Sequence, residues 1–162
     1  MYSTQMTVTV PASPAEVYRA LLDADSIARW RVPDDMTAHV HEFDAREGGR
    51  FRVSLTYELA GADAPRGKTT GHTDTYHGRF VSLVPDQQVV EATEFETDDP
   101  ALRGEMRMTT TLTAHARGTD VTIVHEGIPD AVPKDQNEAG TRMALARLAR
   151  LFEQGDPPTL AP

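Results

Sequence analysis

The chain of 162 residues has the length of one domain, and its 39% content of hydrophobic residues is sufficient for one core. It contains no cysteine, which excludes disulfides and thiolate-bound metal, and its net charge of −9 argues against binding to nucleic acid or to an anionic membrane. Because the N-terminus resembles neither a signal peptide nor a membrane span, we expect a cytoplasmic protein with one domain over residues 1–162, comprising a core at about 5–154 and a C-terminal tail at 155–162.

The first part of the chain predicts one strand followed by two short helices. Residues 4–10 alternate and are rich in β-branched side chains, which is typical of a strand. Ser13, Pro14 and Glu16 then supply an N-cap, a proline at the first helical position and a capping-box glutamate. A second helical segment follows and carries Trp30, the only tryptophan. In such an arrangement we expect Trp30 near the mouth of any cavity that the sheet encloses.

From about residue 38 the hydrophobic period falls to two, which indicates strands. A turn containing Gly48 and Gly49 precedes a strand whose apolar face consists of Phe51, Val53, Leu55 and Tyr57. A polar loop is expected at 61–70. Four further strands are predicted at 72–84, 88–96, 103–115 and 119–127. Consecutive hairpins of this kind form an antiparallel sheet.

One long C-terminal helix is predicted between Pro133 and Gly155. Asp135 followed by Glu138 is a capping-box start. At 100° per residue one face carries Asn137, Thr141, Ala144, Leu145, Leu148, Leu151 and Phe152. The C-terminal half of this face is bulky and apolar, whereas the N-terminal half is small and polar. We therefore expect a gap between the sheet and the N-terminal half of the helix.

This order of elements predicts an α+β helix-grip fold, in which a curved antiparallel sheet wraps around a long C-terminal helix, with two short helices after the first strand. Several segments resemble the START-like (SRPBCC) superfamily, and most closely its branch named for the C-terminal domain of the activator of the Hsp90 ATPase. The segments that carry the resemblance are 13–21, 27–30, 44–51, 78–85 and 118–122. Members of the superfamily include lipid and hormone binders, aromatase/cyclases and chaperone partners, so the resemblance implies an internal cavity more firmly than an activity.

The chain departs from its relatives at two places. The relatives usually carry Gly-Trp near the start of the last helix, where this chain has Gly140 and Thr141. They also tend to place apolar residues on the strand after the Pro85 turn, where this chain has Glu91 and Thr93. Both departures imply a cavity that is larger or more polar.

Strand alternation places a group of polar side chains on the inner face of the sheet. If Val121 and Ile123 point inward, so does His125, and the same parity starting from Val81 and Leu83 brings in His77 and Arg79. The register of the relatives adds Glu91 and Thr93. These groups are suited to binding a polar ligand group or to acid–base work, but a rim position, or simple pairing of Arg79 with Glu91, is the preferred explanation.

The remaining cavity candidates are apolar or lie on the C-terminal helix, and for the apolar ones core filling is the default interpretation. They are Trp30, Phe51, Val53, Leu55, Tyr57, Val81, Met106, Met108, Ile123, Asn137, Thr141 and Leu145. The methionines are suited to a ligand of irregular shape because thioethers adapt to their neighbours.

No metal site, cofactor or catalytic triad is expected. His39 with His41, and His72 with Asp74, have ligand-like spacing on a strand, but no third ligand accompanies them. Without cysteine, and without a serine in a nucleophile elbow, no nucleophile and base can be assigned.

The preferred interpretation is therefore a protein that binds a small hydrophobic or aromatic molecule in an internal cavity, without catalysis. A polyketide cyclase/dehydratase-like enzyme that uses Glu91, His77 or His125 without metal is the first alternative. A partner module for an Hsp90-type chaperone is the second. The sequence leaves the ligand and the oligomeric state open.

Overall fold

The computed structural model describes residues 1–58, 68–69 and 71–153. The expected loop at 61–70, except for residues 68 and 69, and the expected tail at 155–162 lie outside the described residues. In chain order the elements are β1 (Tyr2–Val10), α1 (Pro14–Leu21), α2 (Ala24–Trp30), β2 (Met36–Phe43), β3 (Arg50–Tyr57), β4 (Thr73–Val84), β5 (Gln88–Phe95), a 3₁₀ helix (Pro100–Leu102), β6 (Met106–His115), β7 (Gly118–Ile128) and α3 (Lys134–Glu153).

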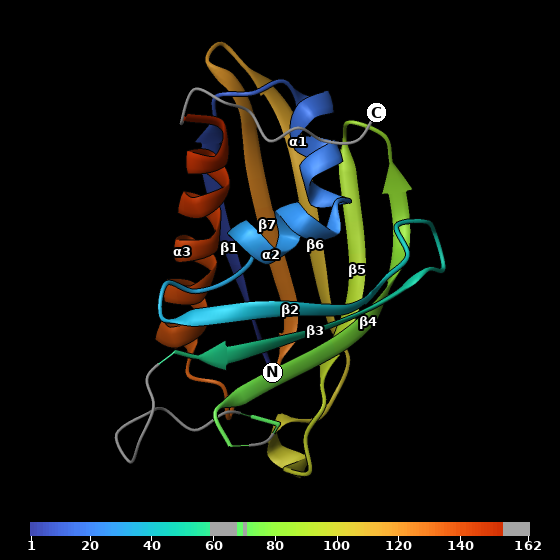
Figure 1. Ribbon diagram of the computed structural model, residues 1–162, viewed down its shortest axis with the longest axis vertical. Coiled ribbons are helices and arrows are strands. Elements are labelled where there is room, and N and C mark those ends of the chain that lie inside the picture. Colours follow the sequence, from blue (N-terminus) through green and yellow to red (C-terminus); the bar gives the residue numbers. More distant parts are fainter. Residues whose placement is uncertain (59–67, 70, 154–162) are drawn as a thin grey trace.

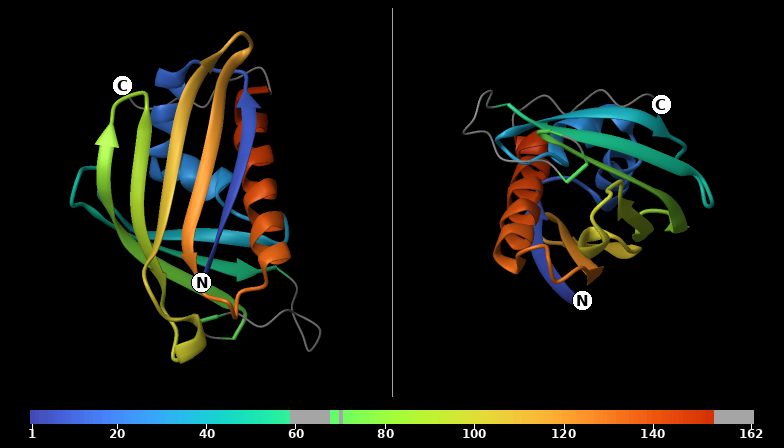
Figure 2. Two further views of the ribbon diagram at one scale, coloured as in Figure 1. Left: turned by 180° about the vertical axis from the view of Figure 1, so that it is seen from behind. Right: turned by 90° about the horizontal axis from the view of Figure 1, so that it is seen from below.

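The predicted helix-grip fold is confirmed. The strands form one antiparallel sheet of seven in the order β1-β7-β6-β5-β4-β3-β2. The sheet is so strongly curved that β2 and β3 cross in front of β5, β6 and β7 (Figure 1). The view from below shows the same curvature enclosing an interior (Figure 2).

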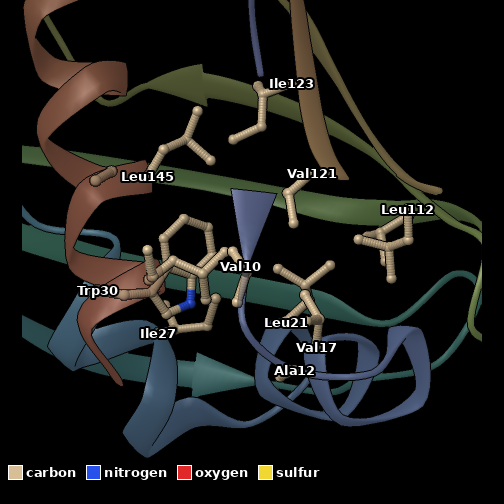
Figure 3. Close-up of a cluster of buried hydrophobic side chains, with 14 of the residues drawn as sticks. Val10, Ala12, Val17, Leu21, Ile27, Trp30, Leu112, Val121, Ile123 and Leu145 are labelled. Atoms are coloured by element: carbon tan, nitrogen blue, oxygen red, sulfur yellow. The ribbon is translucent and has the colours of Figure 1, made fainter. Parts of the chain in front are cut away.

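Local sequence explains the two short helices. The Ser13 side chain accepts a hydrogen bond from the Glu16 amide and caps α1, and Asp23 caps α2 in the same way through the Ser26 amide. Their apolar faces contribute Val17 and other side chains to the main core, where they meet residues of β6, β7 and α3 (Figure 3). The helices therefore close one end of the curved sheet.

Helix α3 packs along β1 and against α2, at one side of the sheet (Figures 1 and 2). Leu145 and Leu148, in its C-terminal half, are buried in the main core. Its N-terminal half is only partly buried, and a Cβ added at Gly140 would meet no atom within 4 Å outside the helix backbone. The bulky and the small halves of the predicted face thus differ in burial as well as in composition.

A β-bulge between Phe80 and Ser82 shifts the register of β4 against β5. Phe80 is fully buried opposite Glu91, and Leu83 packs against the main core, so the inward parity changes across the bulge. Val81, which was expected to face inward, is the inserted residue and is not packed on either core cluster. No helix in the described part of the chain is long and apolar enough to span a membrane.

Candidate functional site

Arg31 is the centre of a polar cluster inside the fold. It is the C-cap of α2, and its Nη1 donates a hydrogen bond of 2.7 Å to Oε1 of Glu91 on β5. Nη2 lies 3.2 Å from the sulfur of Met108 on β6, and the guanidinium lies 5.4 Å from the ring centroid of Tyr76 on β4. The side chains of Arg31 and Glu91 are only 15% and 6% exposed. A helix end and three strands therefore meet at one buried ion pair.

Burial by itself would lower the pKa of Arg31. The attraction of Glu91 and Tyr76, together with the hydrogen bond to Glu91, outweighs burial and raises that pKa. The guanidinium is therefore charged, and its charge is balanced by the Glu91 carboxylate. Such a pair is costly to break, since removing one partner leaves the other charge buried and uncompensated.

His125 is the second component of the cluster. It lies on the inner face of β7, opposite Met108 of β6, and is 7% exposed. Its Nδ1 is 3.3 Å from Nδ2 of Asn137 on α3, and Oδ1 of the same amide accepts a hydrogen bond of 3.0 Å from the Thr4 hydroxyl on β1. Burial, followed by the charge of Arg31, lowers the pKa of His125 to about 4. The imidazole is therefore neutral at pH 7.

Tyr76 is the third component. Its ring packs against Phe51, with the ring centroids 6.2 Å apart. Burial raises the pKa of its hydroxyl, which the Arg31 charge partly offsets, so the hydroxyl keeps its proton. Among the described residues, the buried side-chain atoms without a hydrogen-bond partner are the Tyr76 hydroxyl, His125 Nε2 and Trp30 Nε1. Two of these three atoms belong to the cluster around Arg31.

Most of the apolar candidates lie in or against the main core. Trp30, Phe51, Val53, Ile123 and Leu145 are buried in the main core, and Leu55 and Met108 pack against it. Tyr57 is partly buried, and Met106 belongs to a separate small cluster with Ile128 and Val132. Trp30 is 2% exposed in the midst of apolar side chains, so the expectation that it lies at a cavity mouth is wrong (Figure 3).

The polar candidates separate into three groups, of which two lie inside the fold or on α3. Glu91, Thr93 and His125 are buried on the inner side of the sheet. Asn137 and Thr141 are partly buried on α3, where the Thr141 hydroxyl donates to the Asn137 carbonyl. The structure thus brings Glu91, His125 and Asn137 to the neighbourhood of Arg31.

The expected inward orientation of His77 and Arg79 is wrong, because the bulge reverses the parity that connects them to Leu83. Both lie on the outer face, beside a groove of about 450 Å³. The His77 ring contacts the carboxylates of Glu94 and Glu96 at 2.9 and 3.1 Å, and Arg79 pairs with Glu105 at 2.8 Å. The alternative expectation, that Arg79 pairs with Glu91, is also wrong. Arg79 pairs with Glu105, and Glu91 pairs with Arg31.

The pairs with metal-ligand spacing have other contacts. The rings of His39 and His41 lie edge to face, with centroids 4.5 Å apart, and Asp74 pairs with Lys68 at 3.0 Å. In the part of the chain that the structure describes, no group of three or more His, Asp or Glu side chains is placed to hold a metal ion.

Sequence reasoning missed Arg31, Tyr76 and Thr4 as members of the site. Tyr76 follows from β4 parity once the bulge is known, since it shares a face with Phe80. Thr4 shares the inner face of β1 with Val10, so strand alternation alone was sufficient to find it. Arg31 follows the last residue of a helix, where neither the helical nor the strand period applies, and no sequence signal identifies it.

The chain resembles known proteins over almost its whole length. A sequence model of a family described as "Activator of Hsp90 ATPase homolog 1-like protein" matches residues 11–153. The structure of protein CV1439 from Chromobacterium violaceum is 32% identical, with a TM-score of 0.81, and the match covers 94% of this chain and 99% of that one.

Two further structures share the fold at lower identity. A protein from Rhodobacter sphaeroides is 18% identical with a TM-score of 0.76, covering 95% of this chain and 93% of its own. DynU16, a protein of the dynemicin biosynthetic locus, is 24% identical with a TM-score of 0.65, covering 96% of this chain but 48% of its own. The comparison with curated proteins returned no match.

Proposed function

Since the chain belongs to the family of activator of Hsp90 ATPase homolog 1-like proteins, we propose that it binds a small hydrophobic or aromatic molecule inside the fold. The binding region extends from the inner face of β4 to β7 toward the N-terminal half of α3. The cluster around Arg31 holds the polar end of the ligand. No cofactor or metal takes part in the proposed binding.

One observation carries this proposal. The Tyr76 hydroxyl and His125 Nε2 are buried without hydrogen-bond partners, beside a buried ion pair between Arg31 and Glu91. A buried polar group that lacks a partner destabilises the protein by roughly 1–3 kcal/mol. Native proteins contain few such groups, and functional sites are one place where they occur. A ligand that bonds to these atoms would remove that cost.

The N-terminal half of α3 supports the same location. Gly140 and Thr141 are small and partly buried, and a Cβ added at Gly140 would meet no atom within 4 Å apart from its chain neighbours and the helix backbone. Asn137, one turn before Thr141, already contacts His125 in the cluster. A ligand whose polar end lies at His125 would extend toward this part of the helix.

Native mass spectrometry of the purified protein tests the proposal. We expect a retained small molecule in the wild type, a smaller retained fraction in Tyr76→Phe, and wild-type retention in His77→Phe, which changes a ring on the outer face. If no mass is retained and no bicyclic aromatic compound from a panel raises the melting temperature, the proposal is contradicted.

A second candidate is an acid–base enzyme of the polyketide cyclase/dehydratase kind, and the state of His125 favours it. A neutral imidazole with an unpartnered Nε2, close enough to Arg31 to feel its charge, is suited to moving a proton of a bound substrate. A pH–rate profile that follows an ionisation near 4 and is abolished in His125→Gln would favour this candidate. Binding of the retained molecule without turnover would contradict it.

A partner module for a chaperone is a third candidate, which rests on the family description alone. Such a module acts through its surface, so it should bind Hsp90 equally well with and without Tyr76→Phe. A pull-down with purified Hsp90 that recovers no protein would remove this candidate.

A further inference from the structure

The hydrogen bonds behind His125 determine which of its ring nitrogens carries the proton. Asn137 Oδ1 accepts from the Thr4 hydroxyl, so this amide points its Nδ2 toward His125. An amide nitrogen only donates, and His125 Nδ1 must therefore accept. In a neutral imidazole the other nitrogen then carries the hydrogen, so Nε2 is a hydrogen-bond donor.

The second unpartnered atom is also able to donate. The Tyr76 hydroxyl carries a proton, and no acceptor lies within reach of it in the described part of the chain. Arg31 links the two groups, because its guanidinium lies over the Tyr76 ring and contacts Met108, which is opposite His125 in the sheet. Both donors are therefore unused, and both belong to the buried cluster around Arg31.

The charge at this location is already balanced. Glu91 is 2.7 Å from Arg31, so the pair carries no net charge that a ligand would have to neutralise. A ligand carboxylate would add an uncompensated buried charge, and a ligand ammonium would add a buried positive charge, since the Glu91 carboxylate already pairs with Arg31. A neutral oxygen acceptor can take a hydrogen bond from either donor at no such cost.

We infer that the interior site selects its ligand by a neutral hydrogen-bond acceptor, such as a ketone, ester or quinone oxygen, which is received by His125 Nε2–H and Tyr76 O–H. This inference rests on the proposed binding function and adds the chemical class of the ligand. Thr4 and Asn137 are positioning residues in this arrangement, because they act on the ligand through the tautomer of His125.

The first experiment needs no ligand. Long-range ¹H–¹⁵N correlation spectra of the wild-type protein at pH 7 report which nitrogen of His125 is protonated. We expect the Nε2–H tautomer in the wild type, and in Asn137→Leu a mixture of both tautomers, because the donor to Nδ1 is removed. An Nδ1–H tautomer in the wild type would overturn the inference while leaving the proposed function intact.

The second experiment compares three probes of one shape: 1-tetralone, tetralin and 1-aminotetralin. We expect calorimetry to show that 1-tetralone binds about tenfold more tightly than tetralin, and that 1-aminotetralin binds least. Tyr76→Phe, which retains the ring, should reduce the preference for 1-tetralone several-fold, and His77→Phe on the outer face should not change it. Equal binding of 1-tetralone and tetralin would overturn the inference alone, whereas failure of all three probes to bind would overturn the proposed function and the inference together.

Discussion

At the scale of single residues, the buried ion pair between Arg31 and Glu91 is the most consequential interaction of the site. We predict that Glu91→Ala lowers the free energy of unfolding by about 3–5 kcal/mol, because it leaves the guanidinium buried without a counter-charge. Glu105→Ala is the matched control, since Glu105 pairs with Arg79 at a similar distance on the exposed outer face. Urea denaturation measures both.

The control variant should leave the urea midpoint nearly unchanged. If Glu91→Ala and Glu105→Ala lower the free energy of unfolding equally, burial does not make the interior ion pair more important for stability than the exposed one.

His125 gives the protein a specific dependence on pH. The pKa of this residue falls from 6.5 to about 4 on folding. Between these values the unfolded chain binds a proton that the folded protein does not, so the free energy of unfolding decreases as the pH falls through this window. Above about pH 6.5 His125 does not lower the free energy of unfolding. By pH 4 its protonation in the unfolded chain has lowered that free energy by about 3 kcal/mol.

Thermal melts of the wild type and His125→Gln between pH 7 and pH 4.5 measure this contribution. The melting temperature of the variant should fall less over that range than that of the wild type. His115→Gln, at an exposed histidine, is the matched control. Parallel curves for the wild type and His125→Gln would contradict the neutral buried state of this imidazole.

The sequence predicted part of this residue-scale arrangement. His125, Glu91 and Thr93 lie inside as strand alternation and the family register indicated. His77 and Arg79 do not, because one inserted residue in β4 reverses every assignment made across it. Composition gives no sign of such a bulge, since it depends on how β4 follows the curvature of the sheet.

At the scale of elements, the turn before β3 is hydrogen-bonded to β4, the strand that carries the bulge. Gly48 has a φ of +79°, a left-handed conformation that glycine adopts readily and that this turn requires. The Gly48 amide donates to the Phe80 carbonyl, and the Phe80 amide donates to the Gly49 carbonyl. A Cβ at Gly49 would lie 2.0 Å from the Asp44 carbonyl oxygen, so the backbone leaves no room for a side chain.

We predict that Gly49→Val lowers the free energy of unfolding by more than about 1 kcal/mol through this clash, without changing ligand preference. Gly140→Ala is the contrasting variant, since a methyl group there meets no neighbour and alanine favours the helix, so it should stabilise by about 0.5–1 kcal/mol. Chemical denaturation measures both. An unchanged free energy of unfolding in Gly49→Val would contradict the lack of room at this turn.

Thr141 tests whether the N-terminal half of α3 borders usable space. We predict that Thr141→Trp has equal or greater thermal stability, because an added indole fills space that threonine leaves open, and that it binds 1-tetralone more weakly than the wild type. If Met143 already fills this region, the ring instead overpacks it and costs about 1–3 kcal/mol. Melts with and without 1-tetralone distinguish the two results.

The elements themselves were largely predictable. Capping residues such as Ser13 set the start of α1, and turn residues set the hairpins, because these signals act through neighbours in the chain. The strand expected at 103–115 begins at Met106 instead, and the segment before it forms a 3₁₀ helix at Pro100–Leu102, which the Asp99 side chain caps. The hydrophobic period alone placed the start of β6 too early, because it gave no sign of the 3₁₀ helix that the Asp99 side chain caps.

At the scale of the whole molecule, the order of the expected elements and the resemblance to the START-like superfamily both predicted a helix-grip fold. The sheet of seven strands with its C-terminal helix confirms the fold, and the family match confirms the resemblance. The position of α3 along β1 and α2 could not be predicted, because it depends on the curvature of the complete sheet. The same curvature brings the C-cap of α2 to the inner face of β5, where Arg31 meets Glu91. The site is therefore a product of the whole fold rather than of one motif.

Intermolecular NOEs between 1-tetralone and the ¹³C-labelled protein test the central claim most directly. If the ligand is held inside the fold by its acceptor oxygen, NOEs should connect its ring protons to the side chains of Tyr76, Met108 and His125. NOEs confined to residues of the outer groove, such as Arg79 and Glu94, would place the ligand on the opposite face of the sheet and contradict the account.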